Sequence, residues 1–207
     1  MLFHRYPVRF LAGAVALAAT ALALTITATP AQAYCGETNV QHAKRTRSAH
    51  GAAPLVVGDS TLLIAANKLA ARGISADAMG CRAFDAGLTI LSARRHTRDL
   101  PRLAVLALGS NGTVSGTQIG RALAITGPKR VLGLVTPVNN ASAAAAMKRA
   151  ARRHPKRVLL IDWARRSAGH GSWFIDGLHP SYPGAGAFAR LIEQRLRPTA
   201  KQLRLTR

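Results

Sequence analysis

The sequence predicts an α/β protein whose parallel β-sheet is covered by helices on both faces. Short apolar segments alternate with longer helical segments from about residue 54 to residue 196. This alternation is typical of parallel sheets, because each crossover helix packs on one face of the sheet. Polar motifs also follow several of the apolar segments. Proteins of this class bind their ligands there, beyond the carboxyl ends of the strands.

Five strands and five helices are expected in this region. The apolar runs predict strands at residues 54–57, 74–78, 103–108, 131–135 and 158–161. The helices are expected at residues 61–72, 83–95, 115–124, 141–153 and 184–196. Gly73, Gly127-Pro128 and Pro155 supply stop signals after three of them. We therefore predict one domain over residues 54–197, preceded by an N-terminal arm at 34–53 and followed by a loose basic tail at 198–207.

Residues 1–33 have the three parts of a secretion signal peptide. Positive residues including Arg5 and Arg9 come first, and an uncharged apolar run follows at residues 11–27. Small residues then lead to a cleavage site after Ala33. The alternative is an uncleaved membrane anchor, because the apolar run approaches the lower length limit of a membrane span. We expect cleavage, a mature protein without a transmembrane domain, and a secreted, periplasmic or cell-envelope location.

The two cysteines, Cys35 and Cys81, are expected to form a disulfide. Export takes a chain to an oxidising compartment, where paired cysteines are oxidised. The bond would tie the mature N-terminus to the loop after the second strand. The alternative is two free and inert thiols.

The chain is strongly basic, with 29 Lys and Arg residues against 8 Asp and Glu residues and a formal net charge of +21. Such a charge favours polyanionic surroundings such as envelope polymers, lipid headgroups or nucleic acid. The basic residues are scattered, and they form no basic and aromatic stripe of the kind that reads nucleic acid. We expect electrostatic association with anionic envelope polymers and no specific nucleic-acid partner. A solvated basic surface without a partner is the simpler alternative.

Three short motifs carry groups suited to hydrolysis. They are Gly58-Asp59-Ser60, Gly109-Ser110-Asn111 and Asp176-Gly177-Leu178-His179. The first two follow predicted strands, and the third lies in the long connection after the last strand. In this order they offer a nucleophile, a hydrogen-bond donor for an oxyanion, and a base with its carboxylate. No cluster of His, Cys and Asp has the spacing of metal ligands.

Together with Gly80, these motifs resemble in order the four sequence blocks of the SGNH (GDSL-like) hydrolases. The resemblance spans residues 54–196, and the segment from Asp162-Trp163 to His179-Pro180 is most similar to the SGNH domains of polysaccharide O-acetyltransferases. It implies a three-layer, flavodoxin-like α/β/α sandwich with a five-stranded parallel sheet. It also implies chemistry on acyl esters with neither metal nor cofactor. Thr61 and Ser110 depart from the residues common in the family, which leaves the substrate preference open.

The resemblance and the chemistry assign catalytic roles to three residues. Ser60 would be the nucleophile, and His179 the base that activates it. Asp176 would orient the imidazole and stabilise its cation. Asp162 is the runner-up acid and His170 the rival histidine. The structural alternatives are that Ser60 only caps a helix and that Asp176 only forms a turn.

The oxyanion hole would consist of the Ser60 N–H, the Gly80 N–H and the Asn111 side chain. The roles of Gly80 and Asn111 follow from the resemblance, and each residue could instead serve only as a turn former. Trp163 and Trp173 lie in the segment that leads to His179. They could form a platform for a sugar ring or simply pack within the protein.

These observations predict an exported serine esterase or acyltransferase. Its substrate would be small acyl esters, acetyl above all, on cell-envelope or extracellular polysaccharide, and it would act as a monomer through an acyl-enzyme. The runner-up is a secreted lipase or lysophospholipase, for which the positive charge would serve anionic headgroups. A catalytically inactive envelope-binding module is a third alternative, against which the full set of catalytic groups argues.

Overall fold

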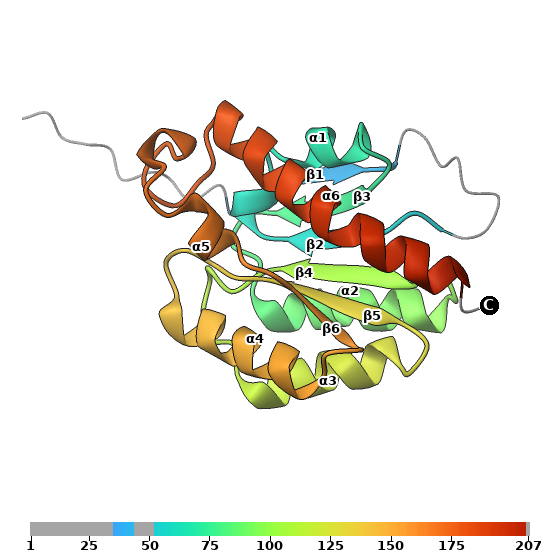
Figure 1. Ribbon diagram of the computed structural model, residues 1–207. Helices are drawn as coiled ribbons and strands as arrows, with labels where there is room; N and C mark the ends of the chain where they lie inside the picture. The colour runs from blue at the N-terminus through green and yellow to red at the C-terminus, as the bar shows by residue number, and fades with distance from the viewer. Residues whose placement is uncertain (1–34, 44–51, 206–207) are drawn as a thin grey trace, which may run out of the picture. The chain divides into compact units, whose positions relative to one another are not determined.

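The computed structural model describes residues 35–43 and 52–205 (Figure 1). The predicted signal peptide and part of the predicted arm lie outside these residues. One mixed sheet forms the centre, with strand order β1-β3-β2-β4-β5-β6. The strands are β1 (Thr38–Gln41), β2 (Leu55–Gly58), β3 (Ser75–Met79), β4 (Leu103–Ala107), β5 (Val131–Val135) and β6 (Val158–Ile161).

The predicted α/β fold class is confirmed, with one correction to the sheet. β2 to β6 are the five parallel strands that the sequence predicts. Their order along the sheet corresponds to the flavodoxin-like arrangement, in which the first strand lies between the second and the third. The sheet has a sixth strand, β1, which comes from the predicted arm and pairs antiparallel with β3 at the edge.

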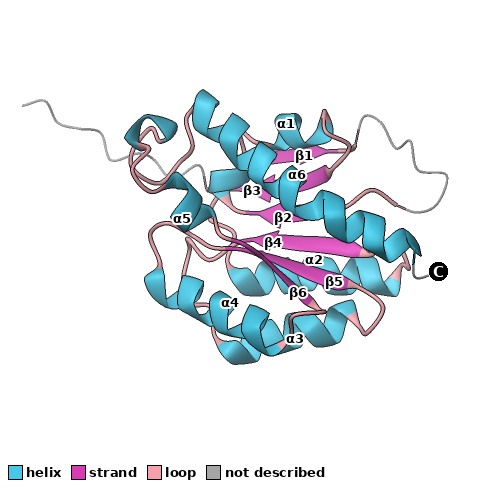
Figure 2. Cartoon of the chain, in the orientation of Figure 1, coloured by secondary structure: helices cyan, strands magenta, loops and turns pink. Residues whose placement is uncertain are grey.

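Helices cover both faces of the sheet (Figure 2). They are α1 (Ala66–Ala70), α2 (Phe84–His96), α3 (Gly116–Thr126), α4 (Ala141–Arg153), α5 (Trp163–Ser167) and α6 (Tyr182–Leu205), with 3-10 turns η1 (Ser60–Leu62) and η2 (Gly171–Trp173). α1, α5 and α6 contribute to one buried cluster, which includes Phe188 and Ile192. α2, α3 and α4 contribute to the other, which includes Leu88 and Met147. All residues of β4 and β5 are buried, because both of their faces are covered.

The last helix is longer than the sequence predicts. The predicted loose tail from residue 198 is wrong as far as Leu205, because α6 begins at Tyr182 and continues through Pro198 to that residue. Proline removes one backbone hydrogen bond and usually interrupts a helix. Ala200 nevertheless packs against the buried cluster under α6, and this contact holds the helix beyond the proline.

The first predicted helix is divided. The sequence predicts a continuous helix at residues 61–72, whereas the structure has η1 followed by the short helix α1. The division places a tight turn directly after β2, at Ser60. The helix α5 and the turn η2, which fill the connection between β6 and α6, were not predicted.

Cys35 and Cys81 form a disulfide, as the sequence predicts. The bond joins the residues before β1 to the loop after β3, with the two Cα atoms 4.9 Å apart. It therefore reinforces the pairing of the edge strand with the parallel sheet.

The free energy of unfolding is expected to fall by about 2–4 kcal/mol when both cysteines are replaced by serine, because the bond restrains the unfolded chain. Urea unfolding of the oxidised protein and of the Cys35→Ser/Cys81→Ser variant measures the difference. Reductant should bring the wild type to the stability of the variant and leave the variant unchanged. Equal stability of the two oxidised proteins would contradict the role given to the bond.

Candidate active site

Ser60 lies in a tight turn at the carboxyl end of β2. Gly58 permits this turn, because a Cβ atom on it would lie 2.6 Å from the Leu62 side chain. The Asp59 carboxylate then caps η1 and accepts hydrogen bonds from the Thr61 N–H at 3.0 Å and the Thr61 hydroxyl at 2.7 Å. Ser60 is thus the first residue of η1, where backbone N–H groups have no partner within the helix.

Asp59 is buried directly behind this turn. Desolvation raises the pKa of its carboxyl above the usual value, and the hydrogen bonds from Thr61 oppose the shift. The backbone N–H of Asp59 also donates to Ala107 at the end of β4, at 3.2 Å. Asp59 therefore holds the serine turn against the neighbouring strand.

Ser60, His179 and Asp176 are joined by a chain of hydrogen bonds. His179 Nε2 lies 2.9 Å from Ser60 Oγ, and His179 Nδ1 lies 2.6 Å from Asp176 Oδ2. A carboxylate only accepts, so Nδ1 carries the proton and Nε2 is left to accept from the serine hydroxyl. The structure thus brings together three side chains from two segments that are 119 positions apart in the sequence.

A short closed loop presents the carboxylate and the imidazole on the same side. Gly177, with φ +82°, makes the turn, and the Ile175 N–H donates to the His179 carbonyl at 2.9 Å. Asp176 Oδ1 accepts from the N–H groups of Leu178 at 3.0 Å and His179 at 2.8 Å. Desolvation opposes ionisation of Asp176, but these bonds and the imidazole outweigh it and lower its pKa to about 2.

Asn111 lies in the loop after β4, next to the serine turn. Its Nδ2 atom is buried and has no hydrogen-bond partner among the residues that the structure describes. The loop is fixed by the Asn140 side chain, which donates to the carbonyls of Gly109 and Gly112 at 2.9 Å each. A buried donor without a partner is costly unless a ligand accepts from it.

Gly80 is placed differently from the expectation. Its N–H donates to the Glu37 carbonyl at 2.8 Å, as part of the contact between the β1 segment and the loop after β3. In this structure the N–H is therefore engaged, and a role for Gly80 in binding an oxyanion would require that hydrogen bond to break. The engagement follows from the edge strand, which the sequence did not reveal.

The two rival residues have other partners. Asp162 caps α5, accepts from the Thr136 hydroxyl at 2.9 Å and forms an ion pair with Lys148 at 3.0 Å. Desolvation raises its pKa, but the bonds from Lys148 and Thr136 outweigh this effect and lower the pKa. His170 stacks on Trp173 with the ring centres 4.0 Å apart.

The two tryptophans pack within the protein. Trp163 is buried and stacks on Trp173 at 5.8 Å, with 6° between the ring planes. His170 and Arg166 also contact the Trp173 ring. The packing alternative therefore describes both residues, and neither offers a free face to a sugar ring.

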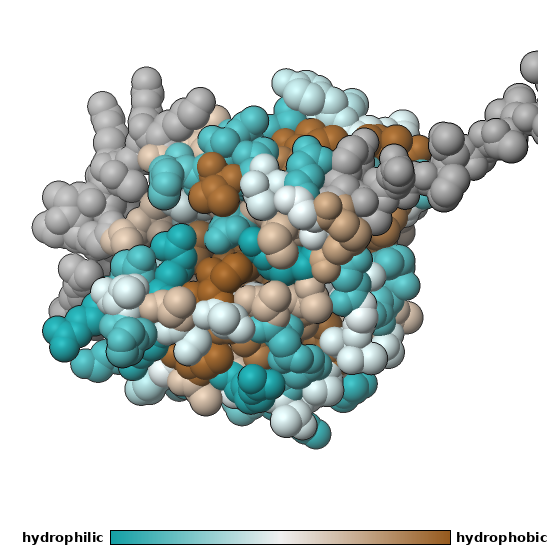
Figure 3. All heavy atoms as spheres, turned by 180° about the vertical axis from the view of Figure 1, so that it is seen from behind, coloured by the Kyte–Doolittle hydropathy of each residue, from teal (hydrophilic) through white to brown (hydrophobic). Residues whose placement is uncertain are grey.

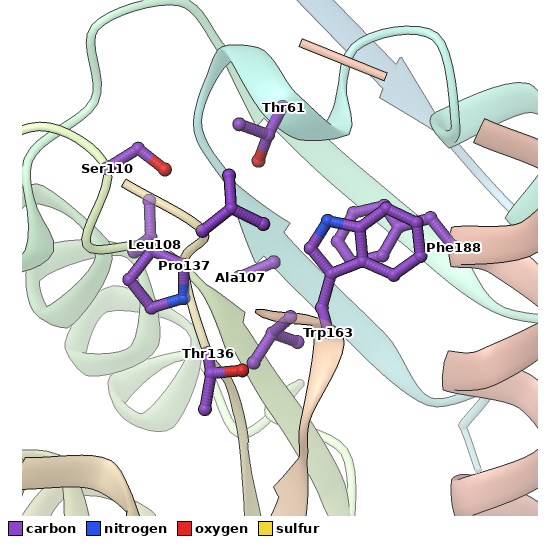
Figure 4. A pocket seen from close by; sticks show the side chains of 10 residues that line it. Thr61, Ala107, Leu108, Ser110, Thr136, Pro137, Trp163 and Phe188 are labelled. Carbon is purple, nitrogen blue, oxygen red and sulfur yellow. The ribbon is translucent and has the colours of Figure 1, made fainter. Parts of the chain in front are cut away.

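A small cavity lies at the carboxyl ends of β4 and β5 (Figure 4). Trp163 and Phe188 form one side and Pro137 the other, and Thr61 and Ser110 lie toward its top (Figure 4). Its volume is about 10 Å³. This is room for about one water molecule or a group of similar size.

Arg82 is a further residue of the site region that the sequence did not single out. Its side chain is only 6% exposed, and it donates to the carbonyls of Gly58 at 3.0 Å and Asp77 at 2.6 Å. It also forms an ion pair with the Asp77 carboxylate at 2.8 Å. Arg82 thereby ties β3 to the end of β2, immediately before the serine turn. Only its place beside Cys81 could have drawn attention to it.

In the residues that the structure describes, no group of three or more His, Cys, Asp and Glu side chains is placed to hold a metal ion. Within the same ranges, none of the helices combines the length and the apolar character needed to cross a membrane.

No protein-family model matches the chain. Among curated proteins, O-acetyltransferase OatA of Staphylococcus aureus is 28% identical over 151 residues, which cover 67% of this chain and 24% of that protein. The chain thus matches only about a quarter of the length of this relative.

Solved structures share the fold. The C-terminal catalytic domain of Streptococcus pneumoniae peptidoglycan O-acetyltransferase A, solved with a methylsulfonyl adduct, superposes with a TM-score of 0.64 at 17% identity. That match covers 79% of this chain and 97% of the domain. A protein assigned to the SGNH hydrolases, from Slackia heliotrinireducens, superposes with a TM-score of 0.56 at 16% identity, covering 69% of this chain and 97% of that chain. The resemblance to the SGNH hydrolases is therefore confirmed, and the chain has their fold.

The stability contributed by Asp176 is expected to depend on pH. Because its pKa is lowered to about 2 in the folded protein, its ionised form contributes stability above the unfolded pKa of about 4. That contribution is lost as the pH falls from about 4 to about 2. Urea unfolding of wild type and Asp176→Asn should show a stability difference that shrinks as the pH falls from about 4 to about 2. A difference as large at pH 2 as at pH 7 would exclude this linkage.

Replacing Arg82 by methionine is expected to lower the free energy of unfolding by about 3 kcal/mol, because it removes the ion pair of the half-buried Asp77 carboxylate and the hydrogen bonds to two carbonyls. Arg94→Met is the matched control, because Arg94 pairs with the exposed Asp99 at 3.3 Å. Such a surface pair contributes only about 0–1 kcal/mol. Chemical unfolding of both variants provides the test, and equal losses would argue against a special role for Arg82.

Proposed function

We propose that this protein is an exported serine esterase or O-acyltransferase that acts on acetyl and other small acyl esters of envelope or extracellular polysaccharide. The observation that carries the proposal is the hydrogen-bonded chain from Ser60 through His179 to Asp176. It lies at the carboxyl edge of a parallel sheet, next to the unpaired Asn111 amide.

The geometry supports a covalent route. As Ser60 Oγ attacks the ester carbonyl carbon, His179 Nε2 takes the hydroxyl proton. The negative charge that develops on the carbonyl oxygen would be met by the Asn111 Nδ2–H and the Ser60 N–H, each such donor being worth about 3 kcal/mol. Asp176, held ionised by its backbone hydrogen bonds, stabilises the imidazolium.

The tetrahedral intermediate then collapses and expels the alcohol, which takes the proton from His179. The acyl group remains on Ser60. In the second half, a water molecule or a sugar hydroxyl gives its proton to His179 and attacks the acyl carbonyl. Release of the product restores the serine hydroxyl, so the protein is unchanged after one turnover.

Three observations favour a short acyl group on a polysaccharide. The cavity beside Thr61 and Ser110 has room for a group the size of a methyl, whereas a long acyl chain would have to lie elsewhere. The relatives named above include O-acetyltransferases, one of them described as acting on peptidoglycan. The predicted signal peptide and the net charge of +21 suit an enzyme that works among anionic envelope polymers.

A secreted lipase or lysophospholipase is the second candidate, and ester chain length separates the two. The purified protein is expected to hydrolyse p-nitrophenyl acetate much faster than p-nitrophenyl octanoate, because the cavity is small. A preference for octanoate would favour the lipase. A chito-oligosaccharide acceptor separates hydrolysis from transfer. If free acetate is the only product at every acceptor concentration, the protein is an esterase and not a transferase.

A fluorophosphonate is expected to label Ser60, and Ser60→Ala should lower kcat/KM on p-nitrophenyl acetate by several orders of magnitude. Ser92→Ala is the matched control, because Ser92 is exposed on α2. Asp176→Asn should reduce activity far more than Asp162→Asn, since Asp162 serves α5 and Lys148. Labelling of another serine, or full activity of Ser60→Ala, would contradict the assignment of Ser60 as the nucleophile.

A further inference from the structure

Three of the exposed apolar side chains lie close in sequence to the proposed catalytic residues. In the parts of the chain that the structure describes, four large hydrophobic side chains are exposed, namely Val40, Ile64, Ile175 and Tyr182. Ile64 follows Ser60 by four positions, Ile175 directly precedes Asp176, and Tyr182 follows His179 by three positions. On the face opposite to that of Figure 1, hydrophobic and hydrophilic residues are mixed, with a hydrophobic area near the centre (Figure 3). The exposed apolar residues near the site are thus candidates for contact with a ligand.

A groove begins at the same residues. It lies between the segment that enters β1, the helix α1 and the start of α6, and its volume is about 590 Å³. This is within the range of about 300–1,000 Å³ that is usual for ligand sites. Leu63 and Ile64 line it shortly after Ser60, and Tyr182 lines it shortly after His179. The groove is therefore lined by residues that follow both halves of the proposed active site closely in the sequence.

The lining combines one aromatic ring with hydrogen-bonding groups. The Tyr182 side chain is 74% exposed, and Lys68 Nζ lies over its ring, 3.3 Å from the centre. Glu37, Thr38 and Asn67 are exposed along the groove and offer a carboxylate, a hydroxyl and an amide. This set can both accept and donate hydrogen bonds beside an apolar surface.

The lining argues against two other kinds of ligand. A lipid chain would leave the polar groups of Glu37 and Asn67 along the groove without partners. A polyanion would need more cationic than anionic side chains along the groove. Arg72 is already paired with Glu193 at 3.3 Å, and the Glu37 carboxylate offsets the charge of Lys68. A neutral sugar ring, with apolar C–H faces and a belt of hydroxyl or acetamido groups, matches both features of the lining.

We propose that this groove is a saccharide subsite that binds a sugar ring of the polysaccharide next to the acylated residue. The inference rests on the proposed function and adds the place on the protein where the polysaccharide lies. Tyr182 would stack on the sugar through the face of its ring opposite Lys68, while Glu37, Thr38 and Asn67 would bind the hydroxyl and acetamido groups of the sugar. The subsite lies outside the four sequence blocks, so the motifs of the sequence did not reveal it.

Binding of chitotetraose, measured by isothermal titration calorimetry, tests the subsite. The wild-type protein should bind it, and Tyr182→Ala should weaken the affinity about tenfold, a loss that corresponds to about 1.4 kcal/mol. Tyr182→Phe should retain the affinity, because it keeps the ring. Val40→Ala is the matched control, since Val40 is an exposed apolar residue of β1 that does not line the groove. Equal affinities of wild type and Tyr182→Ala, or no binding by the wild type, would overturn the subsite.

Labelling of Ser60 by a fluorophosphonate in the same samples separates this inference from the proposed function. Labelling without chitotetraose binding would remove the subsite and leave the esterase. Binding that depends on Tyr182, in a protein whose Ser60 is not labelled, would keep the subsite and remove the catalytic assignment. If the protein binds lysophospholipid micelles through Tyr182 and does not bind chitotetraose, the groove is a lipid site and the proposal is overturned.

Discussion

The parallel pairing of β2 with β4 is the interaction on which the site depends. It places Gly58 opposite Ala107, so that the two strands end side by side and their loops emerge together. The chain leaves β2 toward β3 and leaves β4 toward β5, on opposite sides of the pair. Because the connections diverge there, a crevice remains at the carboxyl edge, where ligands of such sheets bind. Ser60 and Asn111 occupy the two sides of this point.

His179 reaches the same point by a different route. His179 belongs to a loop that is closed by its own hydrogen bonds and leads into α6. Packing of Phe188 and Ile192 on the sheet sets the position of α6 and therefore of the loop. The serine is thus positioned by the sheet, whereas the imidazole is positioned by a helix that lies on it. The contact between Ser60 and His179 joins two separately built parts.

Much of this arrangement was predictable from sequence because local patterns carry it. The strands at 131–135 and 158–161 and the helix at 141–153 have the predicted bounds, since each is a clear apolar or helical run between stop signals. The motif order likewise led to the three side chains that the structure joins. In contrast, β1 is four residues of half-exposed edge strand with no apolar pattern. Its position depends on pairing with β3 and on a disulfide, neither of which is a local signal.

The features that depend on distant contacts were missed for the same reason. The engagement of the Gly80 N–H follows from β1, and the role of Arg82 follows from carbonyls on two other strands. Tyr182 carries no motif and is notable only once α1 and the β1 segment lie beside it. In α6, Pro198 is a local stop signal that a tertiary contact overrides.

The division between sheet and helix has a consequence for inactivation by heat. A small slide of α6 would carry Asp176 and His179 together, because their mutual bonds lie within one loop. It would separate the pair from Ser60, whose turn stays with β2 and β4. Sub-global opening of this kind needs less free energy than complete unfolding. The contact between Ser60 and His179 would then be lost reversibly at temperatures where the sheet is still intact, so residual secondary structure would be a poor guide to the integrity of the site.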